Sequence, residues 1–249
     1  MLKLFICLVL VVLTLVKNVA TAEIRVGVAS NFIYTAKLLS KAYVAKGNEE
    51  PILLFGSTGK HAAQIRSGLK IDLLLAADSK RPADLLADRF GMHESLETYA
   101  LGNLIFWFSA DLKLDKNIEE LIAKMCETDA VIAIANPLLA PYGVASKEVL
   151  AAVSGGRPCE AQIVVGENVA QVAHFANTGS VSAAFLPKAM APYMLGGSSF
   201  DVPNELHSPI EQKMILLSAS LEALKFYRFI LSDEGRSIIR SNGYDLKHD

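Results

Sequence analysis

The stretch Asn136-Pro137-Leu138-Leu139-Ala140-Pro141-Tyr142-Gly143 follows an apolar run at residues 131–135 and precedes a helical pattern that begins near Val144. The apolar run predicts a buried strand, and the two prolines predict a braced turn that opens a helix. Backbone amides at a helix N-terminus lack partners within the helix, so together with the phenol of Tyr142 they outline an anion site. This unit of strand, turn and helix decides the fold class because the chain repeats it.

Three other turns repeat the unit, each closing an apolar run and opening a helical pattern. They are Ala29-Ser30-Asn31, Gly56-Ser57-Thr58-Gly59 and Gly166-Glu167-Asn168-Val169. None of these turns contains Lys or Arg. Alternating strands and helices of this length predict parallel sheets, whose ligands bind at the carboxyl ends of the strands. We therefore expect several neutral donors to converge on a small oxyanion.

The predicted elements form two groups joined by crossing segments. An aromatic strand at residues 103–109 leads out of the first group, and a strand at residues 213–217 returns to it. This order predicts a two-lobed α/β fold in which each lobe is a mostly parallel sheet flanked by helices. We expect lobe I at residues 23–104 and 213–249, lobe II at residues 105–212, and the ligand in a hinged cleft between them.

Periodicity also predicts the individual elements of the second half of the chain. We expect helices at residues 118–126, 144–153, 169–176, 221–231 and 234–242, and strands at residues 131–135, 163–166 and 181–186. The polar stretch at residues 196–208 has no periodicity and is predicted to be a loop.

The first 22 residues have the pattern of a signal peptide. Lys3 precedes an apolar run at residues 4–16, and Val19-Ala20-Thr21-Ala22 ends in the small residues that signal peptidase recognises. An uncleaved membrane anchor is the alternative, but the run is shorter than the roughly 20 residues of a membrane span. We expect export to the periplasm with cleavage after Ala22.

The size and charge of the mature chain narrow its class. About 227 residues remain after cleavage, which exceeds the usual size of one core and favours two lobes. Cleavage removes Lys3 and Lys17 from 24 basic residues and none of the 26 acidic residues, so the net charge is about −4. This mildly acidic balance argues against nucleic acid or an anionic membrane surface as a partner.

Cys126 and Cys159 are the two cysteines of the mature chain. Each precedes a predicted strand on the same side of one sheet, and neighbouring parallel strands would bring the two residues close together. An exported protein permits a disulfide, while two buried free thiols are the alternative. The sequence leaves both open.

The histidines and carboxylates form no catalytic or metal-binding pattern. The five histidines lie at positions 61, 93, 174, 207 and 248 without zinc spacing, and no serine has the setting of a nucleophile elbow. Asp78 follows an apolar run, where helix capping or a hinge role is favoured over a role as a base. An enzyme is disfavoured, and so is an iron-binding protein, because Tyr142 and Tyr193 lack clustered His and carboxylate partners.

Five segments carry a resemblance to a known family. They are Ala29-Ser30-Asn31-Phe32, Phe55-Gly56-Ser57-Thr58-Gly59, residues 72–78, residues 136–143 and Gly166-Glu167-Asn168-Val169-Ala170-Gln171. Over essentially its whole mature length the chain resembles the periplasmic molybdate-binding proteins of ABC importers, which have the type II periplasmic-binding-protein fold. The long block at residues 136–143 is the most specific part of this match.

The resemblance implies a site made of neutral donors, with no cofactor and no metal cation. The implied ligand-binding residues lie at the ends of strands in both lobes, and Tyr142 and Val169 act through their backbone amides. The set is Ser30, Asn31, Ser57, Thr58, Tyr142 and Val169. Leu186 falls where one branch of the family has a ligand-contacting Tyr, so this chain lacks that donor.

The resemblance also implies a role and partners. The expected role is that of a monomer that binds molybdate or tungstate and delivers it to an ABC permease in the inner membrane. Sulfate or another oxyanion on the same fold is an alternative ligand. A sensory or adhesion module that kept the fold and lost transport is a third interpretation.

Overall fold

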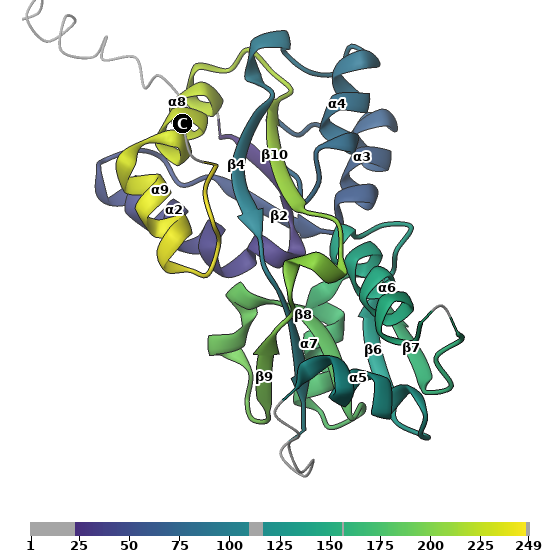
Figure 1. Cartoon of the computed structure of the whole chain (residues 1–249). Helices are drawn as coiled ribbons and strands as arrows, with labels where there is room; N and C mark the ends of the chain where they lie inside the picture. The colour runs from purple at the N-terminus through teal and green to yellow at the C-terminus, as the bar shows by residue number, and fades with distance from the viewer. Residues whose placement is uncertain (1–22, 110–116, 156, 248–249) are drawn as a thin grey trace, which may run out of the picture.

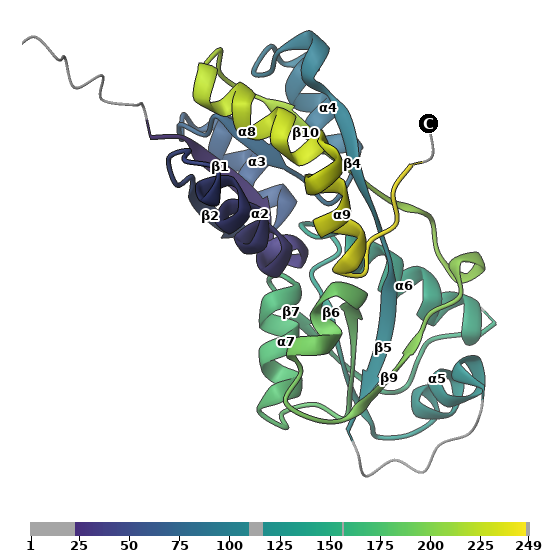
Figure 2. The same cartoon turned by 90° about the vertical axis from the view of Figure 1, so that its left-hand side faces the viewer.

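Two five-stranded sheets organise the part of the chain that the structure describes, which is residues 23–109, 117–155 and 157–247 of a computed structural model (Figure 1). The predicted signal peptide, residues 1–22, lies outside these residues. Helices flank both faces of each sheet (Figures 1 and 2). The predicted two-lobed α/β fold is confirmed.

One strand of the first sheet is antiparallel to the other four. The strand order is β2 (Ile52–Gly56), β1 (Arg25–Ala29), β3 (Leu73–Leu75), β10 (Ile210–Leu216) and β4 (Glu97–Gly102). β1 pairs in parallel with β2 and β3, while β10 pairs antiparallel with β3 and β4. The four parallel strands therefore end at the edge of the sheet that faces the second lobe.

The second sheet has the same plan. Its strand order is β7 (Gln162–Gly166), β6 (Val131–Ala135), β8 (Ala183–Pro187), β5 (Leu104–Phe108) and β9 (Ser198–Asp201). β6 pairs in parallel with β7 and β8, and β5 pairs antiparallel with β8 and β9. In each sheet, the strand that runs against the others adjoins a crossing between the lobes.

Helices bury both faces of the first sheet. One face carries α2 (Ile33–Ala45), α8 (Leu221–Leu231) and α9 (Asp233–Ser241), and the other carries α3 (Thr58–Arg66) and α4 (Lys80–Ala87) (Figure 1). Leu73 and Leu75 belong to the core under α2 and α8, whereas Leu74 between them packs toward α3 and α4. Side chains alternate between the faces of a strand, so a strand buried on both faces is apolar at every position.

The second sheet lies between α7 (Val169–Asn177) on one face and α5 (Ile118–Cys126) and α6 (Pro141–Val153) on the other (Figure 2). Ile122, Val149 and Val172, one from each helix, join a core that includes Phe106 and Phe185. Short 3₁₀ helices complete the fold: η1 (Ser30–Phe32), η2 (His93–Ser95), η3 (Lys188–Tyr193) and η4 (Asn204–Leu206). Within the described residues, no helix combines the length and hydropathy of a membrane span.

The chain crosses between the lobes twice. β4 ends at Gly102 and β5 begins at Leu104, so the two strands form an almost continuous ribbon along the molecule (Figure 2). The return crossing lies between Asp201, the end of β9, and Ile210, the start of β10. A pair of short connections between two separately cored lobes is the geometry of a hinge.

Several sequence predictions are confirmed to the residue, and others are wrong. The predicted bounds of α5, β6 and α8 match the structure. The predicted loop at residues 196–208 is wrong, because it contains β9 and η4, and β4 was not predicted. β9 is a mostly exposed edge strand of sequence SSFD. Its composition does not indicate a strand, and it is one because it pairs with β5.

Two predicted starts are also corrected. α6 begins at Pro141 rather than at Val144, because proline fits the first turn of a helix, where no N–H is required. β10 begins at Ile210 rather than at residue 213. Ile210 and Gln212 are buried and alternate with the polar, half-buried Glu211 and Lys213, which is the pattern of a strand with one buried face.

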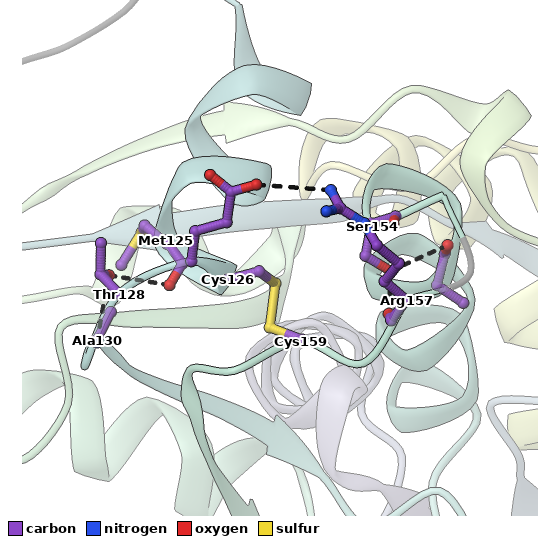
Figure 3. Close-up of a disulfide and its surroundings, with 9 residues drawn as sticks. Met125, Cys126, Thr128, Ala130, Ser154, Arg157 and Cys159 are labelled. Atoms are coloured by element: carbon purple, nitrogen blue, oxygen red, sulfur yellow. Dashed lines mark hydrogen bonds and ion pairs between the residues drawn. A yellow bond between two sulfur atoms is a disulfide. The ribbon is translucent and has the colours of Figure 1, made fainter.

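Cys126 and Cys159 form a disulfide, which decides between the two alternatives that the sequence left open (Figure 3). The bridge joins the last residue of α5 to the segment before β7, with a Cα–Cα distance of 4.6 Å. The amide of Glu160 also donates to the carbonyl oxygen of Cys126 at 2.7 Å. The disulfide therefore fixes α5 to the edge of the second sheet.

Replacing both cysteines by serine is expected to destabilise the fold. The bridge closes a segment of 33 residues, and loop-closure entropy for that length corresponds to about 3–4 kcal/mol of unfolding free energy. Urea titration of the oxidised protein and of the Cys126→Ser/Cys159→Ser variant measures the difference. Equal midpoints would show that the bridge contributes nothing to stability.

Candidate functional site

A small cavity lies between the carboxyl ends of the strands of the two lobes. Its volume is about 10 Å³, counted as space for the centre of a water molecule. A sphere of that volume, enlarged by a water radius of about 1.4 Å, has a radius of roughly 2.7 Å. This is the size of one small inorganic ion and too small for a sugar or an amino acid. The lining residues are Ala29, Ser30, Asn31, Ser57, Thr58, Ala77, Ala140, Pro141, Tyr142, Asn168 and Val169.

The structure brings all six predicted site residues together around this cavity. Each is at most 4 % exposed. The first lobe contributes four from the turns after β1 and β2, and the second contributes two from the starts of α6 and α7. Their contact with a ligand stays a prediction. Leu186 is not among the lining residues and is fully buried in the core of the second lobe.

The turn between β2 and α3 presents two hydroxyl groups. Ser57 is the N-cap residue of α3, yet its side chain makes no capping bond, and its buried Oγ has no hydrogen-bond partner within the described residues. Thr58 Oγ1 accepts a hydrogen bond from the amide of Ala77 at 2.9 Å. That bond leaves the Thr58 O–H to donate elsewhere. A buried hydroxyl without a partner is costly, so Ser57 is poised for an acceptor.

The start of α6 offers one backbone amide. Pro141 has no N–H, and the amides of Gly143 and Val144 reach the carbonyl oxygen of Ala140 at 2.9 and 3.3 Å. In the described part of the chain, the first-turn amide without a backbone acceptor is therefore that of Tyr142. The proline-braced turn thus isolates the backbone donor that the resemblance implies. The Tyr142 phenol, which the sequence also placed at the anion site, instead accepts a hydrogen bond from Gln212 Nε2 at 3.3 Å.

At the start of α7, one backbone amide likewise remains available to a ligand. Asn168 is the N-cap residue, and its Oδ1 accepts from the amides of Ala170 at 3.0 Å and Gln171 at 3.2 Å. The amide of Val169 remains at the cavity. Asn168 lines the cavity but was not in the predicted set. An Asn directly before a helical pattern is a capping signal, and this signal could have identified its role.

The turn after β1 is held by hydrogen bonds from the Asn31 side chain to buried side chains of the first lobe. The Asn31 side-chain amide donates to Gln212 Oε1 at 2.9 Å and to Tyr244 Oη at 3.2 Å. Both hydrogens of that amide are therefore engaged inside the protein. A hydrogen bond from Asn31 to a ligand would have to come from its backbone N–H.

The Tyr142 phenol and the His61 imidazole, which lie at the cavity and behind it, are neutral near pH 7. Burial raises the pKa of the Tyr142 phenol well above its usual value, with the neighbouring Tyr244 and Tyr99 adding to the effect. Burial also lowers the pKa of His61, which contacts the carbonyl oxygen of Val28 at 3.2 Å. None of the lining residues is Asp, Glu, Lys, Arg or His. The cavity therefore presents dipoles and no formal charge.

Contacts across the cleft hold the lobes against each other. The amide of Gly59 donates to the carbonyl oxygen of Leu139 at 2.9 Å, and Lys60 Nζ lies 2.7 Å from Glu167 Oε1. Tyr34 and Tyr193 stack with ring centroids 3.5 Å apart. These contacts join the two lobes around the cavity, and we call this arrangement the closed form.

Asp78 has the capping role that the sequence favoured. Its Oδ1 accepts from the amide of Arg81 at 2.7 Å, and its Oδ2 pairs with Arg81 Nη1 at 2.6 Å. Arg81 Nη2 in turn donates to the carbonyl oxygen of Leu138 in the second lobe at 2.7 Å. The carboxylate of Asp78 therefore orients a cation that spans the cleft.

A larger groove of about 180 Å³ adjoins the cavity, and Ala77 and Pro141 line both. Its lining includes the carboxylates of Asp78, Glu148 and Glu211. It also includes Lys80 and Arg81, but these cations are already paired with Asp84 and Asp78. Carboxylates repel anions, so the small neutral cavity is the better candidate for an anion site.

Comparison with known proteins finds relatives along nearly the whole described chain. The family model described as bacterial extracellular solute-binding protein matches residues 24–245. The molybdate-binding protein ModA of Rhodobacter capsulatus is 31% identical over 229 residues, with 90% of this chain and 89% of the relative covered. ModA of Azotobacter vinelandii is 28% identical over 232 residues, covering 91% of each. The solved structure of the Azotobacter vinelandii periplasmic molybdate-binding protein superposes with a TM-score of 0.79 at 28% identity, covering 91% of this chain and 100% of that chain.

Proposed function

Because the chain belongs to the bacterial extracellular solute-binding protein family, and within it to the molybdate-binding relatives, we propose that it binds molybdate or tungstate outside the cytoplasm. In this proposal it delivers the anion to the permease of an ABC importer in the inner membrane. It acts as a monomeric binding protein and not as an enzyme. The leader at residues 1–22, cleaved after Ala22, would place it in the periplasm.

The cavity between the lobes is the observation that carries this proposal. It is small, it lies at the carboxyl ends of strands in both lobes, and its lining has dipoles without formal charge. A dianion can exchange its hydration shell for O–H and N–H donors at helix N-termini without a counter-charge. Neutral donors also permit release, which a carrier requires.

The donors proposed for the anion come from both lobes. The first lobe supplies the hydroxyls of Ser57 and Thr58 and the turn at Ser30 and Asn31, and the second supplies the amides of Tyr142 and Val169. Binding would therefore favour the closed form, because only that form brings the two halves together. We propose residues 23–104 with 210–249 and residues 105–209 as the moving bodies. The boundary lies at residue 210 rather than at residue 213 because all of β10 belongs to the first sheet.

Calorimetric titration of the mature protein with molybdate, tungstate, sulfate and phosphate at neutral pH tests the proposal. Molybdate and tungstate are expected to bind with one site per chain and to displace each other. Sulfate, which has the same charge and a smaller radius, is expected to bind more weakly because the closed donors cannot all reach it. Tighter binding of sulfate would reassign the ligand, and no heat with any of the four anions would refute an oxyanion carrier.

A further inference from the structure

Gln212 is a fully buried polar residue at the centre of a hydrogen-bond network behind the cavity. It has 0% exposure and lies on β10, the strand that returns the chain to the first lobe. Its Oε1 accepts from the side-chain amide of Asn31 at 2.9 Å and from the Tyr99 hydroxyl at 3.1 Å. Its Nε2 donates to the Tyr142 hydroxyl at 3.3 Å. One side chain thus contacts a residue from each half of the cavity wall.

The backbone around Gln212 is shaped for these contacts. The pairing of β10 with β4 shifts register between Gln212 and Lys213, and such a bulge redirects a side chain. Gly102, at the end of β4, faces the same point. A Cβ on Gly102 would overlap Tyr142 Oη and would lie 2.7 Å from Gln212 Nε2. The glycine therefore provides the space in which a second-lobe phenol meets a first-lobe amide.

The rest of the network fixes Asn31 and stays uncharged. The Tyr244 hydroxyl donates to the Asn31 carbonyl oxygen at 2.7 Å, and it accepts from the Asn31 side chain. The single O–H of Tyr99 is shared between Gln212 Oε1 and the carbonyl oxygen of Ala76, which lies at 3.0 Å. Burial raises the pKa of the Tyr99, Tyr142 and Tyr244 phenols. The turn after β1 is consequently held in one position relative to β10.

We propose that Gln212 is a positioning residue for the oxyanion site, setting the distance between the Asn31 turn and the Tyr142 amide in the closed form. This inference rests on the proposed function. Gln212 does not line the cavity, so it acts through the two residues that do. By fixing the spacing of the two half-sites, it determines both the affinity for the anion and the preference for a larger anion over sulfate.

The Gln212→Leu variant tests the affinity and the preference together. Leucine has a similar volume but cannot bond to Asn31 or to Tyr142. We expect the Kd for molybdate to rise at least about 30-fold and the ratio of sulfate to molybdate Kd to fall about tenfold. Ser95→Ala is the matched control, because Ser95 is buried and bonds to the amide of Leu216 on the same strand, away from the cavity. The control is expected to keep both constants within about threefold of the wild-type values.

The Gln212→Glu variant separates positioning from general damage to the fold. A protonated Glu carboxyl can accept from Asn31 and donate to Tyr142 as the amide does, whereas an ionised one adds a negative charge behind the anion. Binding of the dianion then requires uptake of a proton. The Tyr99, Tyr142 and Tyr244 phenols face position 212, and the pKa of each is raised above its usual value. Asp78 acts on Tyr99 through its charge in the wild type and in the variant alike. The new carboxyl is therefore the group that makes the pH response of the variant differ from that of the wild type. We expect the Kd of Gln212→Glu to fall up to tenfold for each unit of pH lowered from 8 to 6, toward the wild-type value.

The titrations of the two Gln212 variants decide between support and rejection of the positioning role. The proposal is supported by loss of affinity in Gln212→Leu together with recovery of Gln212→Glu at pH 6, relative to wild-type protein titrated at the same pH values. It is overturned if Gln212→Leu binds molybdate within threefold of the wild type, or if Gln212→Glu binds no more tightly at pH 6 than at pH 8 and stays at least about tenfold weaker than the wild type at both. If Gln212→Leu does not fold, the pH profile of Gln212→Glu decides alone. Failure of the wild-type protein to bind any of these anions would instead refute the proposed function.

Discussion

Ser57→Asp is expected to lose molybdate binding by at least a thousandfold while the protein stays folded. At about 4 Å and an effective dielectric constant of about 20, each pair of unit charges repels by about 4 kcal/mol. A loss of that size raises Kd about a thousandfold, and a dianion experiences it twice. Ser57 is the N-cap residue of α3 and makes no capping bond. Aspartate is a preferred N-cap residue, so the melting temperature without ligand should not fall. Calorimetric titration and a thermal melt measure the two quantities.

Ser57→Asn is the matched control for this charge. Asparagine has nearly the volume of aspartate and is also a preferred N-cap residue, but it carries no charge. We expect it to lose some affinity through crowding and to bind far more tightly than the aspartate variant. Equal affinities of Ser57→Asn and Ser57→Asp would mean that the anion is not bound beside Ser57.

Gly143→Ala is expected to destabilise the protein by about 3 kcal/mol, although the same change in a helix normally stabilises by roughly 1 kcal/mol. Gly143 lies in the first turn of α6, where a Cβ would overlap the carbonyl oxygen of Ala135 and lie 2.8 Å from the Ala135 carbonyl carbon. Both atoms belong to the backbone of β6 and cannot rotate away. The helix start would have to move, and the Tyr142 amide would move with it. Urea unfolding and molybdate titration measure the two effects.

Gly196→Ala provides the comparison for Gly143. A Cβ at Gly196 meets no atom within 4 Å among the described residues, and its φ is not positive. We expect its unfolding free energy and its molybdate affinity to match those of the wild type. If Gly143→Ala behaves in the same way, the close contact of α6 with β6 is not required for the site.

The parts of the site that depend on local signals could be predicted from the sequence. Each turn lies between an apolar run and a helical pattern, and the bounds of α5 and β6 follow from periodicity alone. Because strands of one parallel sheet end at the same edge, the turns after Ala29 and Gly56 could be placed together in the first lobe. The turn after Ala135 belongs to the second sheet, and the predicted two-lobed fold with its ligand between the lobes brought it to the same cavity. The resemblance to the molybdate-binding family narrowed the choice of ligand.

The parts that depend on distant pairing could not be predicted in this way. Gln212 and Asn31 are 181 positions apart, and nothing in the sequence around Gln212 distinguishes it from a residue on a solvated strand face. β9 is polar and mostly exposed, and it is a strand because β5 lies beside it. The closeness of Gly102 to Tyr142 is likewise visible only after folding. The network that positions the donors therefore appears only in three dimensions.

A crystal structure of the mature protein with molybdate would show which groups bind the anion. We expect a tetrahedral anion between the lobes, within hydrogen-bond distance of the Ser57 and Thr58 hydroxyls and of the Tyr142 and Val169 amides, with no charged side chain in contact. An anion bound instead by lysine or arginine side chains, or a metal cation held among these residues, would contradict this expectation.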